Sequence, residues 1–265
     1  MMVSKLCLTQ ARTHFLSPPP HLSLSSLSHL PFLLRRRSSL KMSSTTTTTP
    51  QIIEHFVLFK VKPDTDPSNI TAMIDNLAAL SSLDLVAHLS SGPLLRTRSS
   101  PFPFTHLLHS RYKSKHDLDA YSAHPSHVRV VTENVKPICD DIMAVDWVTY
   151  DLPGPVSPPP GSAMRVTFLK LKEGVGENEK ARVLDVIGGI KGVFPAIEQI
   201  SFGENFSMGR AKGFSIGSVA ILPGLSELEA MDSERAGLEK DKVRDLIESV
   251  IVLDYVVPQQ QSASL

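Results

Sequence analysis

The side chains best suited to acid–base chemistry are histidines, and they are unevenly distributed along the chain. All ten histidines of the 265-residue sequence lie before residue 128. Histidine can take or give a proton near neutral pH because its ordinary pKa is about 6.5. One run, Tyr121-Ser122-Ala123-His124-Pro125-Ser126-His127, places a phenol close to two imidazoles. Any imidazole chemistry is therefore expected in the first half of the chain.

The same run also has a structural interpretation. Proline is favoured at the first position of a helix, so Pro125 can begin one and His124 can cap it. Tyr121 can then pack its ring under a sheet, with its hydroxyl bonded to the backbone. We therefore consider His124 and Pro125 a structural motif, and we expect His109 and His116 to face solvent. A zinc site is not indicated, because the sequence offers no His-x₃-His helical pair and no cysteine partner.

The elements that must position these residues occur twice. The β-branched and aromatic segment at 52–62 has a counterpart at 164–172, shifted by 110 residues. Val145-Asp146-Trp147-Val148 similarly matches Leu253-Asp254-Tyr255-Val256 at a shift of 108. A proline-rich segment at 151–162 separates the two copies and should act as a semi-rigid spacer. The sequence therefore predicts a duplication of a whole domain.

Each copy is expected to fold as β-α-β-β-α-β. In the first copy, Asp66-Pro67 should cap and begin a helix, and a second helical stretch over 114–138 should break near Pro125. Strands are expected at 52–62, 84–91, 104–112 and 142–150, with a loop between the second and third. The last helix of the second copy should present Val243, Leu246, Ile247 and Val250 on one face.

Such a sheet, with helices on one face only, leaves its other face bare. Two sheets can cover each other. The predicted fold class is therefore α+β, with two tandem domains packed face to face as an intramolecular sandwich or barrel, the single-chain version of a homodimer.

The two ends of the chain have the composition of targeting segments. Residues 1–49 are rich in serine and threonine, contain arginine and lack acids, which is typical of a transit peptide. The last three residues, Ala263-Ser264-Leu265, are a variant of a peroxisomal address. We expect a peroxisomal location, with chloroplast or cytosol as alternatives. The expected organisation is a leader at 1–49, domains at 50–150 and 163–257, a linker at 151–162 and a tail at 258–265.

The net charge of zero hides two opposite charges. Residues 1–50 hold six basic and no acidic groups, which leaves 27 − 6 = 21 basic and 27 acidic groups in the rest, a net of −6. An acidic body without a basic stripe argues against a nucleic-acid partner. No apolar run is long enough to span a membrane.

The sequence motifs of both copies resemble those of a known family, the stress-responsive dimeric A/B barrel (Dabb) domain. In the first copy the resemblance is carried by His55, Phe104-Thr105-His106, the run from Tyr121 to His127, and Val145-Asp146-Trp147. In the second copy it is carried by 202–207, 210–214 and Leu253-Asp254-Tyr255. It covers about 51–150 and 163–257, and the whole chain resembles plant double-domain members with a peroxisomal-type tail. The resemblance implies an α+β fold of two tandem ferredoxin-like (dimeric α/β-barrel) domains, whose sheets pack as an intramolecular pseudo-dimer barrel.

The resemblance also implies candidate sites. A similar plant polyketide cyclase places a tyrosine and a histidine in a cleft between sheet and helices, and its functional positions correspond to His55, His106, Tyr121 and His127. In the second copy, Arg165, Met231 and Glu234 stand where the first has His55, Tyr121 and His124. Some relatives also hold a magnesium-type ion on backbone carbonyls at the end of the first helix. The matching positions here are Leu77, Leu80, Ser81 and Leu83.

Three functions remain open on the sequence. The first is a non-catalytic stress-response protein that binds a small apolar ligand and requires no cofactor. The second is a polyketide-cyclase-like lyase that acts on an apolar acyl substrate through Tyr121 and His127. The third is a defence protein that acts on membranes or partner proteins. A second copy of the chain is a further expected partner. An apolar cavity onto which the four candidate side chains converge would favour the enzyme, and a filled interior would favour a structural role.

Overall fold

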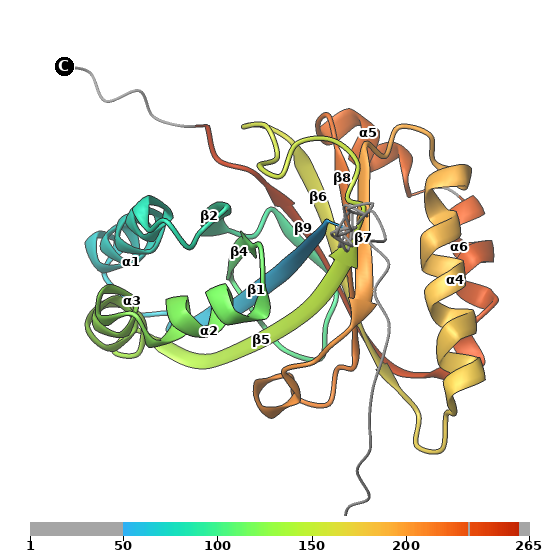
Figure 1. Ribbon diagram of the computed structural model, residues 1–265, viewed down its shortest axis with the longest axis horizontal. Helices are drawn as coiled ribbons and strands as arrows, with labels where there is room; N and C mark the ends of the chain where they lie inside the picture. The colour runs from blue at the N-terminus through green and yellow to red at the C-terminus, as the bar shows by residue number, and fades with distance from the viewer. Residues whose placement is uncertain (1–49, 233, 260–265) are drawn as a thin grey trace, which may run out of the picture. The chain divides into compact units, whose positions relative to one another are not determined.

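The computed structural model describes residues 50–232 and 234–259, which form two antiparallel sheets with helices packed against them (Figure 1). The predicted leader and the Ala263-Ser264-Leu265 address lie outside the described residues. The first sheet has the strand order β2-β4-β1-β5 and the second β3-β9-β6-β8-β7. The strands are β1 (Gln51–Val61), β2 (His88–Pro93), β3 (Arg96–Ser99), β4 (His106–Tyr112), β5 (Cys139–Tyr150), β6 (Ala163–Leu171), β7 (Gln199–Glu204), β8 (Ile216–Leu222) and β9 (Ile247–Val256).

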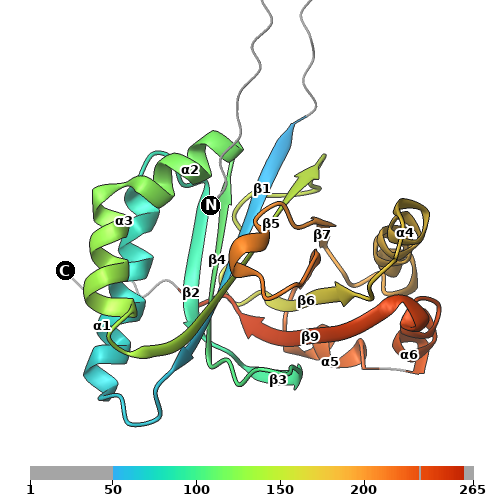
Figure 2. The ribbon, with the colours of Figure 1, turned by 90° about the horizontal axis from the view of Figure 1, so that it is seen from below.

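The helices of each half cover one face of its sheet (Figures 1 and 2). Those of the first half are α1 (Pro67–Ala79), α2 (Lys115–Ala123) and α3 (Pro125–Val130), with the short turns η1 (Leu80–Ser82) and η2 (Val131–Val135). Those of the second half are α4 (Glu177–Val193), α5 (Leu225–Ala230) and α6 (Glu234–Asp241), with η3 (Met208–Arg210) and η4 (Arg244–Leu246).

Two predicted helix starts are confirmed by their caps. Asp66 Oδ1 accepts the backbone N–H of Ser68 at 2.8 Å, and Pro67 follows as the first residue of α1. His124 Nδ1 accepts the backbone N–H of Ser126 at 3.2 Å, and Pro125 begins α3. In both places the cap bonds an N–H that the first helical turn leaves without a partner.

The duplication predicted from the sequence is visible in the register of the central strands. β1 lies between β4 and β5, and β6 lies between β8 and β9. Each central strand has one irregularity in its pairing, between Lys60 and Val61 in β1 and between Lys170 and Leu171 in β6. These two positions are 110 residues apart, so the two copies share the bulge as well as the strand order.

The inner faces of the two sheets bury each other in one hydrophobic core. Phe56 of β1, Trp147 of β5, Phe168 of β6 and Tyr255 of β9 all belong to it. The rings of Phe56 and Trp147 are stacked with centroids 5.2 Å apart. This core confirms the predicted tandem ferredoxin-like packing, because neither sheet alone could remove these aromatic surfaces from water.

Two predicted elements differ from the structure. The segment predicted as a loop between the second and third strands contains β3, which pairs with β9 of the other half through Arg96 and Asp254. Local periodicity cannot report such a contact, because the partner strand is far away in the sequence. The predicted last helix is also wrong for Ile247 and Val250, which lie in β9 and pair with Leu171 and Leu169 of β6. An apolar stripe of so few residues fits a helix or a strand, and the sheet decides.

Candidate functional site

The centre of the predicted catalytic set is a buried histidine–aspartate pair. His55 Nδ1 lies 2.5 Å from Asp146 Oδ1, across the neighbouring strands β1 and β5. Both side chains are on the helix-covered face of the first sheet and are almost wholly shielded from solvent. Burial alone would raise the pKa of Asp146, but the adjacent His55 outweighs it and lowers that pKa. The carboxylate therefore stays charged and fixes the orientation of the His55 ring.

Tyr121 and His127 also come together in this face. Their rings lie 4.6 Å apart by centroid, and the ring of Tyr112 packs 5.1 Å from that of Tyr121. His127 Nδ1 lies 3.0 Å from the backbone carbonyl of Ser122, an arrangement in which that nitrogen donates. The helix break at Pro125 makes the contact, because it turns α3 so that His127 faces back toward α2.

His106 does not join the set. It is the first residue of β4 and lies opposite Phe59, whereas His55 lies opposite Ser110. Four residues of strand separate the two positions, and Nδ1 of His106 instead lies 2.9 Å from Thr105 Oγ1. The structure thus brings together three of the four predicted catalytic residues and leaves His106 at the end of its strand.

The environments of Tyr121 and His127 favour one protonation state for each side chain. Burial raises the pKa of Tyr121 to about 12, so its hydroxyl remains a donor at neutral pH. Burial lowers the pKa of His127, so its ring is mostly neutral there. A neutral imidazole beside a phenol could move a proton. However, Tyr121 is only 1% exposed, and Tyr112 packs against it, so the space around the Tyr121 ring is filled.

The equivalent position in the second half holds a different ion pair. Arg165 Nε lies 2.9 Å from Asp254 Oδ1 at positions that match His55 and Asp146 after the shifts of 110 and 108. Two arginines of the first half, Arg96 and Arg98, also bond Asp254 Oδ2, at 2.7 and 2.6 Å. These cations outweigh burial, which alone would raise the pKa of Asp254, and that pKa is lowered. The carboxylate therefore joins the two halves.

The second half makes the corresponding contact with the buried aspartate of the first half, Asp146. The segment between β7 and β8 contacts β5, where Asn205 Oδ1 accepts the backbone N–H of Asp146 at 3.0 Å and the N–H of Phe206 bonds the carbonyl of Asp146 at 2.9 Å. Each half therefore sends the segment between its second and third major strands to the buried aspartate of the other. Such reciprocity is the isologous contact of a dimer, preserved within one chain.

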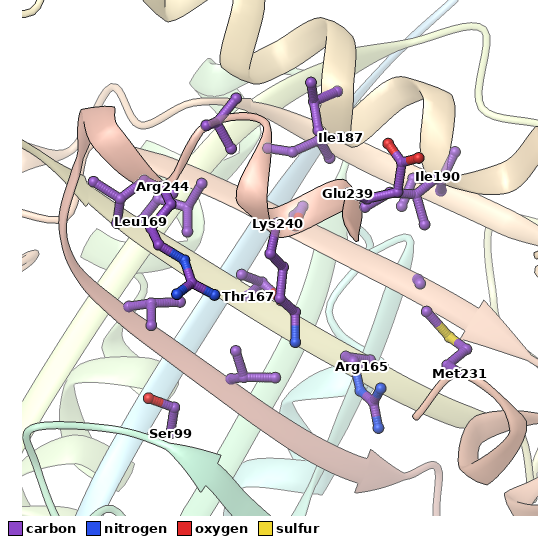
Figure 3. Close-up of a pocket in the computed structure, with 18 of the residues that line it drawn as sticks. Ser99, Arg165, Thr167, Leu169, Ile187, Ile190, Met231, Glu239, Lys240 and Arg244 are labelled. Atoms are coloured by element: carbon purple, nitrogen blue, oxygen red, sulfur yellow. The ribbon is translucent and has the colours of Figure 1, made fainter. Parts of the chain in front are cut away.

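A cavity lies in the second half, between the outer face of its sheet and the helices α4 and α6 (Figure 3). Its volume is about 460 Å³, within the range of small-molecule sites. Aliphatic side chains of α4 form one wall, and residues of β6, β8 and β9 form the floor. The apolar lining includes Leu169, Val186, Ile187, Ile190, Phe194, Ile200, Ala220, Met231, Val243, Ile247, Val250 and Val252.

Smaller side chains explain why the cavity is in this half. At the 110-residue shift, Met231 stands where the first half has Tyr121, Ala220 where it has Ser110, and Gly237 where it has His127. Met231 and Ala220 line the cavity. A flexible methionine and a methyl group therefore line the cavity where the first half has a buried tyrosine and a serine. Sequence reasoning missed the cavity residues because they carry no reactive group, although the loss of Tyr121 and His127 at matching positions was a signal.

A further polar cluster lies on the inner face of the first sheet, and it was also missed. His109, predicted to face solvent, is fully buried, with Nε2 2.6 Å from Glu54 Oε2. Arg111 NH2 lies 2.9 Å from Glu54 Oε1, and its NH1 donates to the carbonyl of Val156 in the linker at 2.7 Å. Burial alone would raise the pKa of Glu54, but Arg111 and His109 outweigh it and hold that pKa well below its usual range.

Alternation along the strands could have located this cluster. Glu54 shares an inward-facing register with Phe56, and Arg111 shares one with Leu107. His88 completes the cluster, and burial lowers its pKa to about 2. These groups are closed off from substrate and tie the sheet to the linker, so we assign them a structural role.

The predicted magnesium positions lie at the end of α1 and in η1. The carbonyls of Leu77, Leu80 and Leu83 already accept backbone N–H groups of the same turns. The adjoining small cavity is lined by Arg129 and by no carboxylate. A hard cation prefers anionic oxygen ligands, so this neutral set beside an arginine fits magnesium poorly. In residues 50–232 and 234–259, no group of three or more His, Cys, Asp or Glu side chains is arranged to hold a metal.

Comparisons with a family profile and with known proteins indicate the same family. The profile of the stress responsive A/B barrel domain matches this chain twice, at residues 53–149 and 164–257. A stress-response A/B barrel domain-containing protein of Arabidopsis thaliana is 52% identical, over 94% of this chain and 97% of that protein. A second protein of the same description and the same plant is 46% identical, over 78% of this chain and 97% of its own length.

Solved structures are similar in fold alone. A candidate monooxygenase from Fusobacterium nucleatum superposes with a TM-score of 0.53 at 11% identity, and covers 80% of this chain and 94% of that one. An anthrone oxidase-like protein gives a TM-score of 0.50 at 11% identity, over 82% of this chain and 97% of that one. At such identities the arrangement of two ferredoxin-like units is shared, and no activity follows from it.

Proposed function

We propose that this chain, which belongs to the stress-responsive A/B barrel domain family, binds a small apolar molecule in the cavity of its second half. The observation that carries the proposal is the cavity itself, with its volume of about 460 Å³ and its mainly aliphatic lining. Closure of such a site around an apolar ligand would remove water from both surfaces, which is favourable at about 25 cal/mol per Å² of apolar area.

The chemistry of the lining supports binding rather than turnover. Among the described side chains that line the cavity there is no histidine, cysteine or tyrosine. Arg165 is engaged by Asp254 and Asp232 and is therefore not available as a general acid. The groups that could move a proton, Tyr121 and His127, lie in the other half, on a filled face.

A thermal-shift measurement on the full chain tests the proposal. Neutral apolar probes such as decan-1-ol should raise the melting temperature, because a ligand that binds only the folded state stabilises it by mass action. Val186→Trp places a large ring in the cavity wall and should abolish the shift. Val128→Trp, at a valine that is 50% exposed on α3, is the matched control and should leave the shift intact.

Two results would contradict the proposal. One is the absence of any shift with apolar probes in the native chain. The other is an equal shift in Val186→Trp and in the native chain, with both proteins folded by circular dichroism. The second result would mean that the probe binds elsewhere.

A second candidate function is a cyclase-like or other lyase activity in the first half. The specific observation in its favour is the oriented His55–Asp146 pair beside the Tyr121 and His127 rings. Because this face is filled, substrate entry would require α2 or α3 to move. His127→Gln should remove turnover of an acyl thioester substrate and change the melting temperature little. Turnover that persists in this variant would exclude His127 from the reaction, and no turnover by the native chain would exclude the activity.

The location of the protein in the cell and the association of two copies are proposed from the sequence alone. We propose a peroxisomal destination through Ala263-Ser264-Leu265, which deletion of Leu265 in a fluorescent fusion would test. Association of two copies would be tested by the molar mass in solution. No helix among the described residues is long and apolar enough to cross a membrane.

A further inference from the structure

We propose that the ligand of the second-half cavity is an amphipathic monocarboxylate, such as a medium-chain fatty acid, and that the ammonium group of Lys240 holds its carboxylate. This inference rests on the proposed function, because it assigns a chemical class to the molecule in the same cavity. It follows from the distribution of charge around an otherwise apolar site.

Five charged side chains line the cavity, and four of them already have opposite charges as partners. Arg165 is bonded by Asp254 and Asp232. Arg244 pairs with Asp241, Glu239 with Lys242 and Glu248 with Lys170, each at 2.6 Å. The fifth is Lys240, for which no carboxylate among the described side chains lies within ion-pair distance. The local charge that a ligand would meet is therefore one uncompensated ammonium.

The direction of Lys240 makes this charge part of the cavity. Figure 3 shows its side chain reaching from α6 into the cavity, with the nitrogen toward the sheet, between Thr167 and Arg165. Glu239, the preceding residue, points the other way, toward α4. A lysine that only solvated the surface of α6 would extend away from the apolar floor. The hydroxyls of Thr167 and Ser99 also line the site and provide donors at the same end.

The site favours a ligand with one negative charge, such as a carboxylate, over a ligand with a phosphate group. Lysine acts as a point charge, whereas phosphate groups are commonly held by several donors or by a free arginine fork. The arginines here are already paired, and Glu239 and Glu248 would repel a second negative charge. The aliphatic walls from α4 and β9 then fit an unbranched or compact hydrocarbon body. A monocarboxylate satisfies both parts of the site.

Calorimetric titration of the full chain with matched ten-carbon probes tests the inference. Decanoate, decan-1-ol and decyl phosphate are each titrated below their micelle-forming concentrations. Decanoate should bind about tenfold or more tightly than decan-1-ol, because the carboxylate forms an ion pair with the ammonium group and the alcohol forms only a hydrogen bond to it. Lys240→Met keeps the length of the side chain and should weaken decanoate binding about tenfold while it leaves decan-1-ol within about twofold. Added salt should weaken decanoate binding alone.

Lys113→Met is the matched control, because Lys113 is an exposed lysine of the first half and does not line the cavity. It should change neither affinity. If decan-1-ol and decanoate bind equally, or if Lys240→Met leaves decanoate unchanged, the carboxylate inference is wrong while the binding function stands. Tighter binding of decyl phosphate than of decanoate would also overturn it. If no probe binds, the proposed function itself fails.

Discussion

The two halves of this protein have the same strand order and the same bulge, but they differ in what they place on each face of the sheet. The first half buries polar groups on both faces, with Glu54, His109 and Arg111 inside and His55 and Asp146 beneath the helices. The second half has Met164, Val219 and Ile221 at the inner positions and a cavity beneath its helices. The first copy thus holds networks of buried polar side chains, whereas the second keeps a cavity beneath its helices.

The comparison also shows how the halves depend on each other. Asp254 is bonded by arginines of the first half, and Asp146 by the backbone and amide groups of the second. In a dimer of separate chains these contacts would vary with concentration. In one chain they form intramolecularly, so the second copy can lose its own polar groups without losing its partner.

The largest expected effect comes from breaking the inner polar cluster of the first half. Arg111→Ile leaves Glu54 buried without its cation and should lower the free energy of unfolding by about 3–5 kcal/mol. The triple variant Glu54→Met, His109→Val and Arg111→Ile carries the residues of the second half and should recover most of that loss. Urea unfolding would measure both. A triple variant as unstable as the single one would show that the two inner faces are not interchangeable.

The next effect concerns the closest approach of the halves. A Cβ at Gly217 of β8 would lie 2.5 Å from the ring of Trp147, which is fully buried in the shared core. Gly217→Ala should therefore destabilise the protein by about 1–3 kcal/mol through overpacking. Gly189→Ala, where a Cβ meets nothing within 4 Å in α4, should instead stabilise it by about 0.5–1 kcal/mol. Equal melting temperatures for the two variants would contradict this packing.

The pH dependence of stability should also come from the first half. Burial lowers the pKa of His88 from 6.5 to about 2 and lowers that of His109, so the unfolded chain takes up protons near pH 6.5 that the folded chain does not. Stability is therefore fully present above pH 6.5 and falls as the pH drops below it, by up to about 1.4 kcal/mol per pH unit for His88. The lowered pKa of His109 adds a loss of the same sign. The low pKa of Glu54 adds a loss in the same direction at more acidic pH.

Chemical denaturation at pH 7.5 and pH 5.5 would measure this slope. His116→Gln, at a side chain that is 90% exposed, is the control and should leave the slope unchanged. A slope that persists when both His88 and His109 are replaced by apolar residues would place the titrating groups elsewhere.

The smallest expected effect compares the first helix of each half. Asp66 caps α1 through its side chain, whereas α4 begins after Gly176, which has no side chain to do so. Asp66→Ala should cost about 1 kcal/mol, and Gly176→Asp should gain a few tenths of a kcal/mol. Differential scanning calorimetry would show both shifts. A gain from Asp66→Ala would mean that the Ser68 contacts do not stabilise the helix start.

Much of the fold could be predicted from the sequence, because its signals are local or repeated. Asp66-Pro67 and His124-Pro125 mark helix starts by their own chemistry, and the repeat at 110 residues indicated the tandem arrangement. Two features could not be predicted, because both depend on pairing with distant strands. The strand β3 pairs with β9, and the end of the predicted last helix lies in β9 and pairs with β6. The Tyr121–His127 contact was expected, but the displacement of His106 along β4 required the register.

The sequence by itself determined the duplication, the strand and helix order, and the confinement of histidine to the first half, because periodicity, capping residues and composition act over short distances. Only the tertiary structure decided which half has room for a ligand. A cavity is set by the volumes that side chains from distant elements fill together. The exchange of Tyr121 for Met231 has that meaning only once α4, α6 and the sheet are placed around it.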